Sequence, residues 1–106
     1  MKITTKIPES PAIELIAQDR KRQIIEEGFT VASDMAMNPN GELAAAAACY
    51  AWPKHLHSSQ DDGIFKFWPW EAKWYKPSPN DRKREIIKAA ALLVAEWDRL
   101  DAEESK

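Results

Sequence analysis

The sequence predicts an all-α domain of three main helices joined by a long aromatic loop, with room for one short β-hairpin. Apolar side chains recur every three to four residues in two segments, 11–27 and 79–102, which is the spacing of an amphipathic helix. A run of five alanines, Ala44 to Ala48, favours a third helix between them. The length of 106 residues suits one domain, residues 1–106, with flexible ends at 1–9 and 103–106.

The first helix is expected to begin after Ser10, an N-cap followed by proline at the first helical position. It should run to about Glu27, where Gly28 supplies the C-terminal cap. One face of this helix is apolar, and we expect it to pack into the core; its members are Ile13, Ile16, Ala17 and Ile24.

Residues 28–41 are expected to form a loop that turns Phe29 into the core. The alanine helix should follow at about 41–52 and end at Pro53. Because alanine makes a thin helix that neighbours can approach closely, we expect it to be central. The turn signal at 61–63 would suit the tip of a hairpin that pairs 55–57 with 64–67.

The last helix is expected to begin at Ser78, with Pro79 at its first position and Asp81 completing a variant of the capping box. It should continue to about Ala102. Its apolar stripe, including Trp97, is expected to face the core; the members are Ile86, Ala89, Ala90, Leu93, Trp97 and Leu100, widened by Ile87 and Val94.

Composition excludes several classes of protein. The 15 basic and 17 acidic residues give a net charge of −2, which argues against general nucleic-acid binding. The single cysteine, Cys49, excludes a disulfide framework and is expected to be a buried structural thiol. No apolar run approaches the roughly 18 residues of a membrane span, and the N-terminus lacks a signal peptide, so we expect a cytoplasmic protein without membrane contact.

The candidate site is the aromatic segment at 66–77, in which aromatic residues alternate with lysines. Its aromatic side chains are Trp68, Trp70, Trp74 and Tyr75, and its cations are Lys66, Lys73 and Lys76. Such a segment can stack a planar ring and neutralise phosphates. The alternative interpretation is that the tryptophans form a loop-borne core over the helices.

Two arginines are candidate anion contacts. Arg20 lies in the middle of the apolar face of the first helix, where an unpaired charge would be costly. It is either a fixed cation of a ligand pocket or half of a buried ion pair; the candidate partners are Glu27, Glu42 and Asp81. Arg82 opens the last helix and could lie beside the same pocket, near the helix N-terminal amides.

No motif predicts catalysis, a metal or a cofactor. His55 and His57, with Asp61 and Asp62, lack the further ligands of a rigid metal site and suit an exposed loop. A metal-dependent hydrolase would need paired carboxylates, for which the candidates are Glu26, Glu27 and Glu42. Their spacing departs from the ExxE…ExxD arrangement of all-α nucleotide pyrophosphohydrolases.

The order of motifs resembles a family of small uncharacterised phage and prophage accessory proteins. The matching segments are EEGFT at 26–30, GELAAAAACYA at 41–51, WPW at 68–70, WYKP at 74–77 and DRKREIIKA at 81–89. In this family an acidic cluster often follows the threonine, and Asp34 is what remains of it here. The resemblance covers roughly residues 18–101 and implies a phage-encoded protein acting in the host cytoplasm.

The same order also resembles the ryanodine-receptor repeat domain, through Arg22, residues 28–30, Pro69-Trp70 and Asp81-Arg82. Phe29 stands where that domain has tryptophan. The resemblance implies a non-catalytic helical module that holds an adenine nucleotide.

The expected function is therefore to sequester a nucleotide-type signalling molecule, such as a cyclic nucleotide or an ADP-ribose derivative, and so to blunt a host defence pathway. The expected ligand contacts are Arg20, Trp68, Trp70, Lys73, Trp74, Tyr75 and Arg82. Two alternatives remain open: a module that binds a host protein through exposed tryptophans, and a small nucleotide pyrophosphohydrolase. The thin alanine helix and the aromatic surface would also suit a homo-oligomer.

Overall fold

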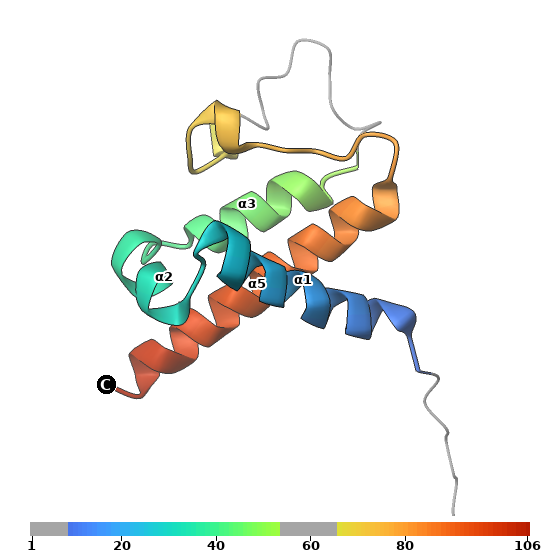
Figure 1. Ribbon diagram of the computed structural model, residues 1–106. Helices are drawn as coiled ribbons and strands as arrows, with labels where there is room; N and C mark the ends of the chain where they lie inside the picture. Colours follow the sequence, from blue (N-terminus) through green and yellow to red (C-terminus); the bar gives the residue numbers. More distant parts are fainter. Residues whose placement is uncertain (1–8, 54–65) are drawn as a thin grey trace, which may run out of the picture.

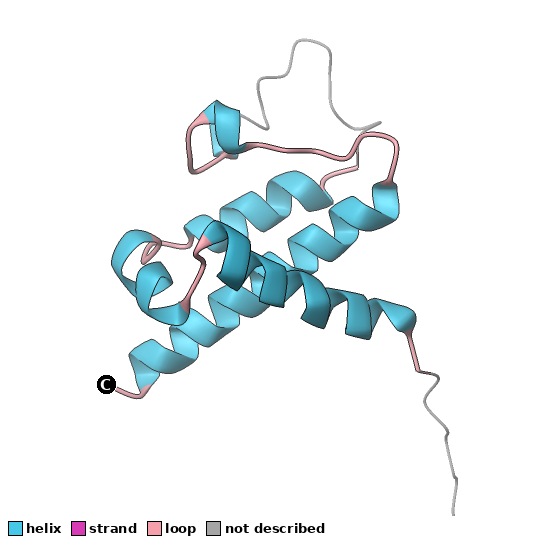
Figure 2. Ribbon diagram, in the orientation of Figure 1, coloured by secondary structure: helices cyan, strands magenta, loops and turns pink. Residues whose placement is uncertain are grey.

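The computed structural model describes residues 9–53 and 66–106, and in these ranges the protein is all-α, as predicted (Figures 1 and 2). Its elements are α1 (Pro11–Glu27), α2 (Val31–Met37), α3 (Glu42–Ala51), the short 3-10 helix η2 (Ala72–Trp74) and α5 (Arg82–Glu104). Most of the predicted hairpin lies outside the described residues, but Lys66 and Phe67, expected to be its last two, are helical rather than extended. None of the described helices has the length and apolar character to cross a membrane.

Helix α5 is the axis of the fold, and α1, α2 and α3 all pack on it. In Figure 1, α3 runs beside the first half of α5, whereas α1 crosses in front of it and the aromatic segment passes over α3. The contact between α3 and α5 is built from small side chains, because Ala46, Ala47, Ala89 and Ala95 are all buried there. The alanine run thus lets the two helices approach closely.

The predicted ends of α1 are confirmed. The Ser10 hydroxyl accepts a hydrogen bond from the backbone N–H of Ala12 at 3.2 Å, and proline occupies the first turn. Gly28 ends the helix in the left-handed conformation, with φ of 73°, which a residue with a Cβ rarely adopts.

The start of α5 and the loop at 28–41 were predicted wrongly. Helix α5 begins at Arg82 because the Asp81 carboxylate, rather than the Ser78 hydroxyl, caps it by accepting the N–H of Arg84 at 3.1 Å. Within the expected loop, Val31–Met37 forms α2, capped by the Thr30 hydroxyl. Helix α2 has only 7 residues, too few to show a clear periodicity in sequence.

The apolar faces of α1 and α5 were also assigned wrongly. The predicted stripe of α5 is largely exposed, with Trp97 64% and Leu93 52% accessible, while its smaller residues face α3. Helix α1 crosses α5 instead of lying along it, so Ile13 and Ile24 stay exposed. Its buried residues are polar: Asp19, Arg20 and Gln23.

The close contact of α3 with α5 predicts that replacing Ala46 and replacing Ala48 will have very different effects on the free energy of unfolding. Ala46→Leu adds three carbon atoms where no space is left and should lower the free energy of unfolding by about 1–3 kcal/mol. Ala48→Leu, on the exposed side of α3, is the matched control and should change it by less than about 0.5 kcal/mol. Urea denaturation followed by circular dichroism measures both, and equal effects would contradict the packing.

Candidate functional site

The aromatic segment divides into buried and accessible parts. Trp68 is buried, and its ring packs edge-on against Tyr50, Trp70 and Tyr75, with centroids 5.6, 5.3 and 5.1 Å away. Its indole N–H donates to the backbone carbonyl of Glu71 at 3.0 Å. Trp68 is therefore the anchor that holds the segment to the helices, as the core interpretation of the tryptophans predicts for this one residue.

Tyr50 and Tyr75 complete this anchor. Their rings stack with centroids 5.3 Å apart, and the Tyr50 hydroxyl accepts the backbone N–H of Lys76 at 3.0 Å. Burial raises the pKa of Tyr75 to about 12, with further increases from the charge of Glu85 and from Tyr50. Burial also raises the pKa of Tyr50, so both phenols are neutral at physiological pH. Tyr75 therefore acts as a packing residue that supports the accessible tryptophans.

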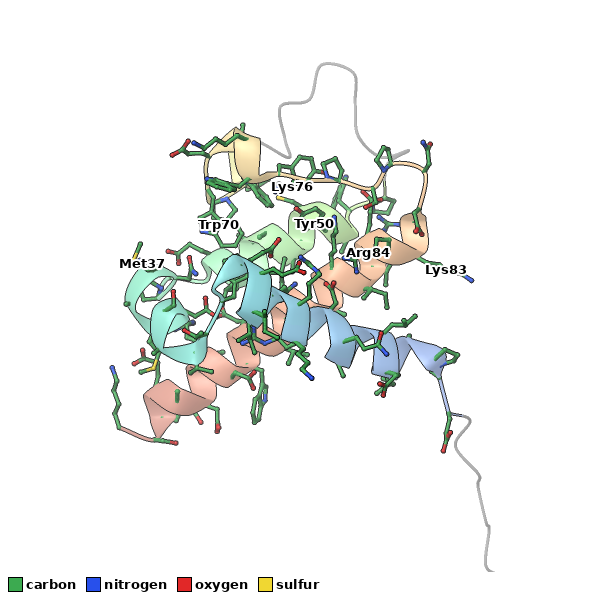
Figure 3. All side chains as sticks on the ribbon, viewed as in Figure 1. Met37, Tyr50, Trp70, Lys76, Lys83 and Arg84 are labelled. Atoms are coloured by element: carbon green, nitrogen blue, oxygen red, sulfur yellow. The ribbon has the colours of Figure 1, made fainter. Side chains whose placement is uncertain are left out.

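A cleft of about 970 Å³ opens between the aromatic segment and the helices. Its walls come from the end of α1, from α2 and from the first half of α5, and Tyr50 belongs to its floor. Figure 3 shows Trp70, Tyr50 and Lys76 gathered on this side of the molecule, whereas Lys83 points away from it. Its volume is within the range of small-molecule sites.

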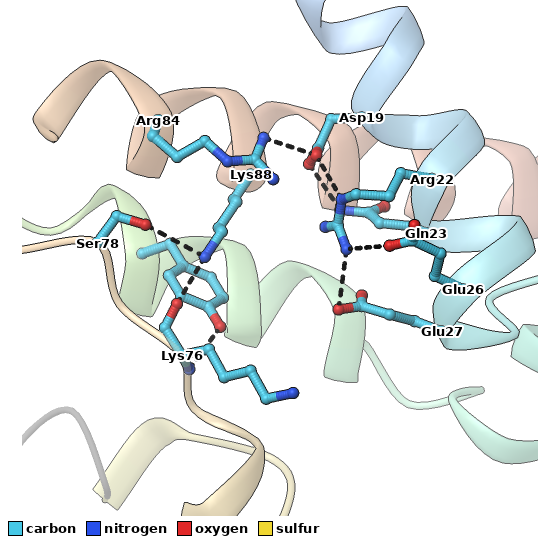
Figure 4. A network of polar contacts seen from close by, with 10 residues as sticks. Asp19, Arg22, Gln23, Glu26, Glu27, Lys76, Ser78, Arg84 and Lys88 are labelled. Atoms are coloured by element: carbon cyan, nitrogen blue, oxygen red, sulfur yellow. Dashed lines mark hydrogen bonds and ion pairs between the residues drawn. The ribbon is translucent and has the colours of Figure 1, made fainter.

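Three cations of the cleft lining come from the helices: Arg22 from α1, and Arg84 and Lys88 from α5. Both guanidinium groups are held by the buried carboxylate of Asp19, which accepts from Arg22 at 2.8 Å and from Arg84 at 2.7 Å (Figure 4). Burial alone would raise the pKa of Asp19, but the hydrogen bonds from these two arginines outweigh it and lower the pKa. Asp19 therefore stays ionised and fixes both cations at the crossing of α1 and α5.

The ammonium group of Lys88 is the least compensated charge of this cluster. It donates to the Lys76 carbonyl at 2.6 Å and to the Ser78 hydroxyl at 3.4 Å, and it lies 5.4 Å from the centre of the Tyr50 ring. Burial lowers the pKa of Lys88, and the positive charges of Arg84 and Arg22 lower it further. An anion beside Lys88 would relieve this repulsion.

Trp70 is the aromatic wall of the cleft. Its ring is half-buried and stacks on Phe29, with centroids 5.5 Å apart. Its indole N–H donates to the Asn38 side-chain oxygen at 3.0 Å, and the Asn38 amide donates to the buried Asp34 carboxylate at 2.9 Å. This chain of hydrogen bonds fixes the plane of the Trp70 ring.

Trp74 lies at the mouth of the cleft and is 54% accessible. Lys73 and Lys76 place their ammonium groups 5.3 and 5.9 Å from the centre of its ring. Of these two lysines Lys76 lines the cleft, whereas Lys73 lies outside it and pairs with Glu71 at 3.4 Å.

Arg20 lies behind the cleft wall rather than in it. The side chain is buried, and its guanidinium donates to the backbone carbonyl of Phe29 at 2.8 Å. Its ionic partner is Asp98 on α5, at 3.6 Å, and none of the three carboxylates expected from the sequence. Arg20 therefore secures the turn after α1, on which Phe29 supports Trp70.

Arg82 also has a structural role. Its guanidinium donates to the carbonyls of Tyr50 and Ala51, the last two residues of α3, and of Trp52, which follows them. Cations stabilise helix C-termini in this way. Arg82 thus ties the end of α3 to the start of α5 and lies outside the cleft lining.

Of the seven expected ligand contacts, the structure brings Trp68, Trp70 and Trp74 to the cleft and places the others outside its lining. Four cations line the cleft: Lys76 was already among the lysines of the predicted segment, whereas Arg22, Arg84 and Lys88 were missed. The spacing of Arg84 and Lys88, four residues apart, could have indicated a shared helix face. The apolar stripe of α5, however, was predicted to face the core, and the face that carries Arg84 and Lys88 was therefore expected to be exposed to solvent.

The candidate hydrolase carboxylates are not assembled. Glu26 and Glu27 line the cleft and pair with Arg22 at 3.6 and 3.2 Å, whereas Glu42 accepts the backbone N–H of Asn40. Among residues 9–53 and 66–106, no three His, Cys, Asp or Glu side chains are grouped to hold a metal ion. His55, His57, Asp61 and Asp62 lie outside these ranges.

Comparison of the chain with protein families, with curated proteins and with solved structures finds no match.

The shared carboxylate predicts a specific pH dependence of stability. Because the pKa of Asp19 is lowered in the folded protein, its contribution is present above the ordinary value of 3.8 and is lost as the pH falls through the lowered pKa. Asp19→Asn should therefore cost about 2 kcal/mol near neutral pH, with the difference from wild type shrinking in acid. Thermal unfolding between about pH 7 and pH 2.5 measures this. Glu14→Gln, exposed on the same helix, is the control and should follow wild type throughout.

Proposed function

We propose that the protein is a non-catalytic binding module that holds a nucleotide-type ligand in the cleft, with a planar base against Trp70 and Trp74 and an anionic group at Arg22, Arg84 and Lys88. The observation that supports this most strongly is the cluster of three helix-borne cations in the lining of an aromatic cleft. Each half of the site matches one half of such a ligand, because rings stack on indole and guanidinium forks bind phosphate.

The side chains of the proposed site are pre-organised for ligand binding. Asp19 holds two guanidiniums, and Asn38 holds the Trp70 ring, so little side-chain freedom would be lost on binding. Two carboxylates, Glu26 and Glu27, already compensate Arg22, whereas Lys88 has only neutral partners in its hydrogen bonds. We therefore assign the strongest anion contact to Lys88 and Arg84, with Arg22 beside them.

A role in sequestering a signalling molecule is supported by the two resemblances. The ryanodine-receptor repeat pattern implies nucleotide binding without catalysis, and the phage accessory pattern implies a phage-encoded protein. A phage protein that removes a cyclic nucleotide or an ADP-ribose derivative from the host cytoplasm would blunt the defence that the molecule triggers.

A host-protein partner is the second candidate, and the exposed Trp74 and Met37 at the cleft mouth favour it. It ranks lower because the indole N–H groups of Trp68 and Trp70 are bonded inside the fold, which leaves one tryptophan of the segment largely exposed. The pyrophosphohydrolase ranks third, since Glu42 lies apart from Glu26 and Glu27.

Titration calorimetry against a graded series tests the proposal: inorganic phosphate, adenosine, AMP, ADP-ribose and cyclic dinucleotides. Ligands with both a base and a phosphate should bind at micromolar concentrations, and either part alone should bind at least tenfold more weakly. Trp70→Ala, Arg84→Met and Lys88→Met should each weaken binding by a factor of about 10–100, as expected for a lost stacking or charged contact of 1–3 kcal/mol.

Matched controls are available for both kinds of contact. Lys83→Met removes an exposed cation next to Arg84 but outside the cleft, and Trp52→Ala removes an exposed indole elsewhere. Both should bind like wild type. Absence of binding across the series, or equal losses in the controls, would refute the nucleotide proposal, and a stoichiometric host protein in a pull-down would favour the second candidate.

The lowered pKa of Lys88 predicts a pH dependence of affinity. An anion prefers the charged ammonium, so affinity should be constant near neutral pH and fall as the pH rises through a value below the ordinary 10.5. Lys88→Arg keeps its charge over this range and should flatten the profile. Binding measured at intervals between about pH 7 and pH 10 gives the two curves, and coincident curves would exclude Lys88 as an anion contact.

A further inference from the structure

The outer face of α5 carries an apolar stripe that nothing in the described residues covers. Its large members, Ile86, Leu93, Trp97 and Leu100, are between 43% and 64% accessible. The opposite face of the same helix packs on α3 and lines the cleft through Arg84, Lys88 and Leu92. Soluble monomers rarely leave so continuous an apolar surface open to water.

The spacing of the stripe is that of a helix seam. Ile86, Ala90, Leu93, Trp97 and Leu100 follow one another at intervals of four, three, four and three residues. This repeat of 3.5 residues keeps side chains on the line where a second helix packs at a shallow angle. From Ile86 to Leu100 the seam is about 21 Å long at 1.5 Å per residue. It is already helical in the folded domain, so pairing would not have to order it.

The charges at the two ends of α5 indicate which helix would pack on the seam and in which direction it would run. Residues 82–88 contain four basic side chains and one acidic, whereas residues 96–104 contain five acidic and one basic. The seam itself ends in Lys83, three residues before Ile86, and in Glu104, four residues after Leu100. A second α5 running antiparallel would place each basic end beside an acidic end, and a parallel one would oppose like charges.

The same charges are reversed with respect to the helix's own dipole, which favours acidic residues at the N-terminus and basic residues at the C-terminus. Asp101 and Glu104 beside the seam also argue against a membrane surface, since helices that lie on membranes are flanked by lysine and arginine. An antiparallel copy compensates both ends at once and is self-complementary about a twofold axis.

We infer that the protein forms a twofold symmetric dimer through the outer face of α5, with the two helices antiparallel and the Leu93 side chains near the axis. The two ligand clefts then open on faces turned away from the interface. This dimer does not depend on the proposed ligand, because the seam and the cleft lie on opposite faces of α5.

Sedimentation equilibrium of the full chain tests the association. Wild type should show twice the chain mass of 12.1 kDa, and Leu93→Glu should weaken dimerisation on the order of 100-fold by facing two carboxylates across the axis. Because Leu93 is exposed, circular dichroism should show unchanged helix content. Ile25→Glu replaces an aliphatic residue on α1 that is even more exposed than Leu93; it is the control and should remain dimeric. A monomeric wild type at about 100 μM, or a dimeric Leu93→Glu, would overturn the inference.

Crosslinking tests the direction. Lys83→Cys and Glu104→Cys proteins, treated with a short bismaleimide, should crosslink when mixed and not when separate, and buried Cys49 serves as the unreactive background. Crosslinking of each variant with itself but not with the other would show a parallel pair and overturn the antiparallel arrangement.

Discussion

The buried carboxylate of Asp19 is the interaction on which the arrangement of helices and cleft depends. It lies where α1 crosses α5 and accepts hydrogen bonds from an arginine of each helix. An isolated buried charge is costly, so the carboxylate requires both guanidiniums, and both of these arginines line the cleft. One residue thus sets the crossing point and places two cations side by side.

A second polar chain sets the opposite wall. Asp34 is fully buried, and burial raises its pKa, although the hydrogen bond from Asn38 and the charge of Arg20 oppose the rise. The side-chain oxygen of Asn38 in turn accepts the indole N–H of Trp70 and so fixes the orientation of that ring. Both walls are therefore positioned by buried carboxylates on α1 and α2, and the apolar core between α3 and α5 is left to provide the stable platform. Buried hydrogen-bond networks such as those of Asp19 and Asp34 make a structure rigid, and here they keep the cleft in a defined shape.

Local signals in the sequence predicted the local structure well. Ser10, Gly28 and the alanine run each act through the backbone of their own segment, and the structure confirms the helices they indicate. The aromatic segment was located for the same reason, because its composition is local. Which side of a helix meets the core is decided by other segments, and the pattern of α5 alone could not show it: one face is apolar and large, the other apolar and small. The face with small side chains packs against α3, since small side chains allow two helices to approach closely.

This choice of face explains why the cations were missed and why a seam is left over. Once the alanine face of α5 packs on α3, Arg84 and Lys88 must turn toward the cleft, and the large residues must turn outward. The apolar periodicity of α5 thus marks a surface that the described residues leave uncovered, and the inferred dimer would cover it with a second copy of the helix. The alanine face of such a helix packs inside its own domain, and its leucine-tryptophan face remains available for an interface with another chain. In such a dimer the two cation clusters lie on the far sides of the paired helices, so occupation of one cleft would add no charge repulsion at the seam.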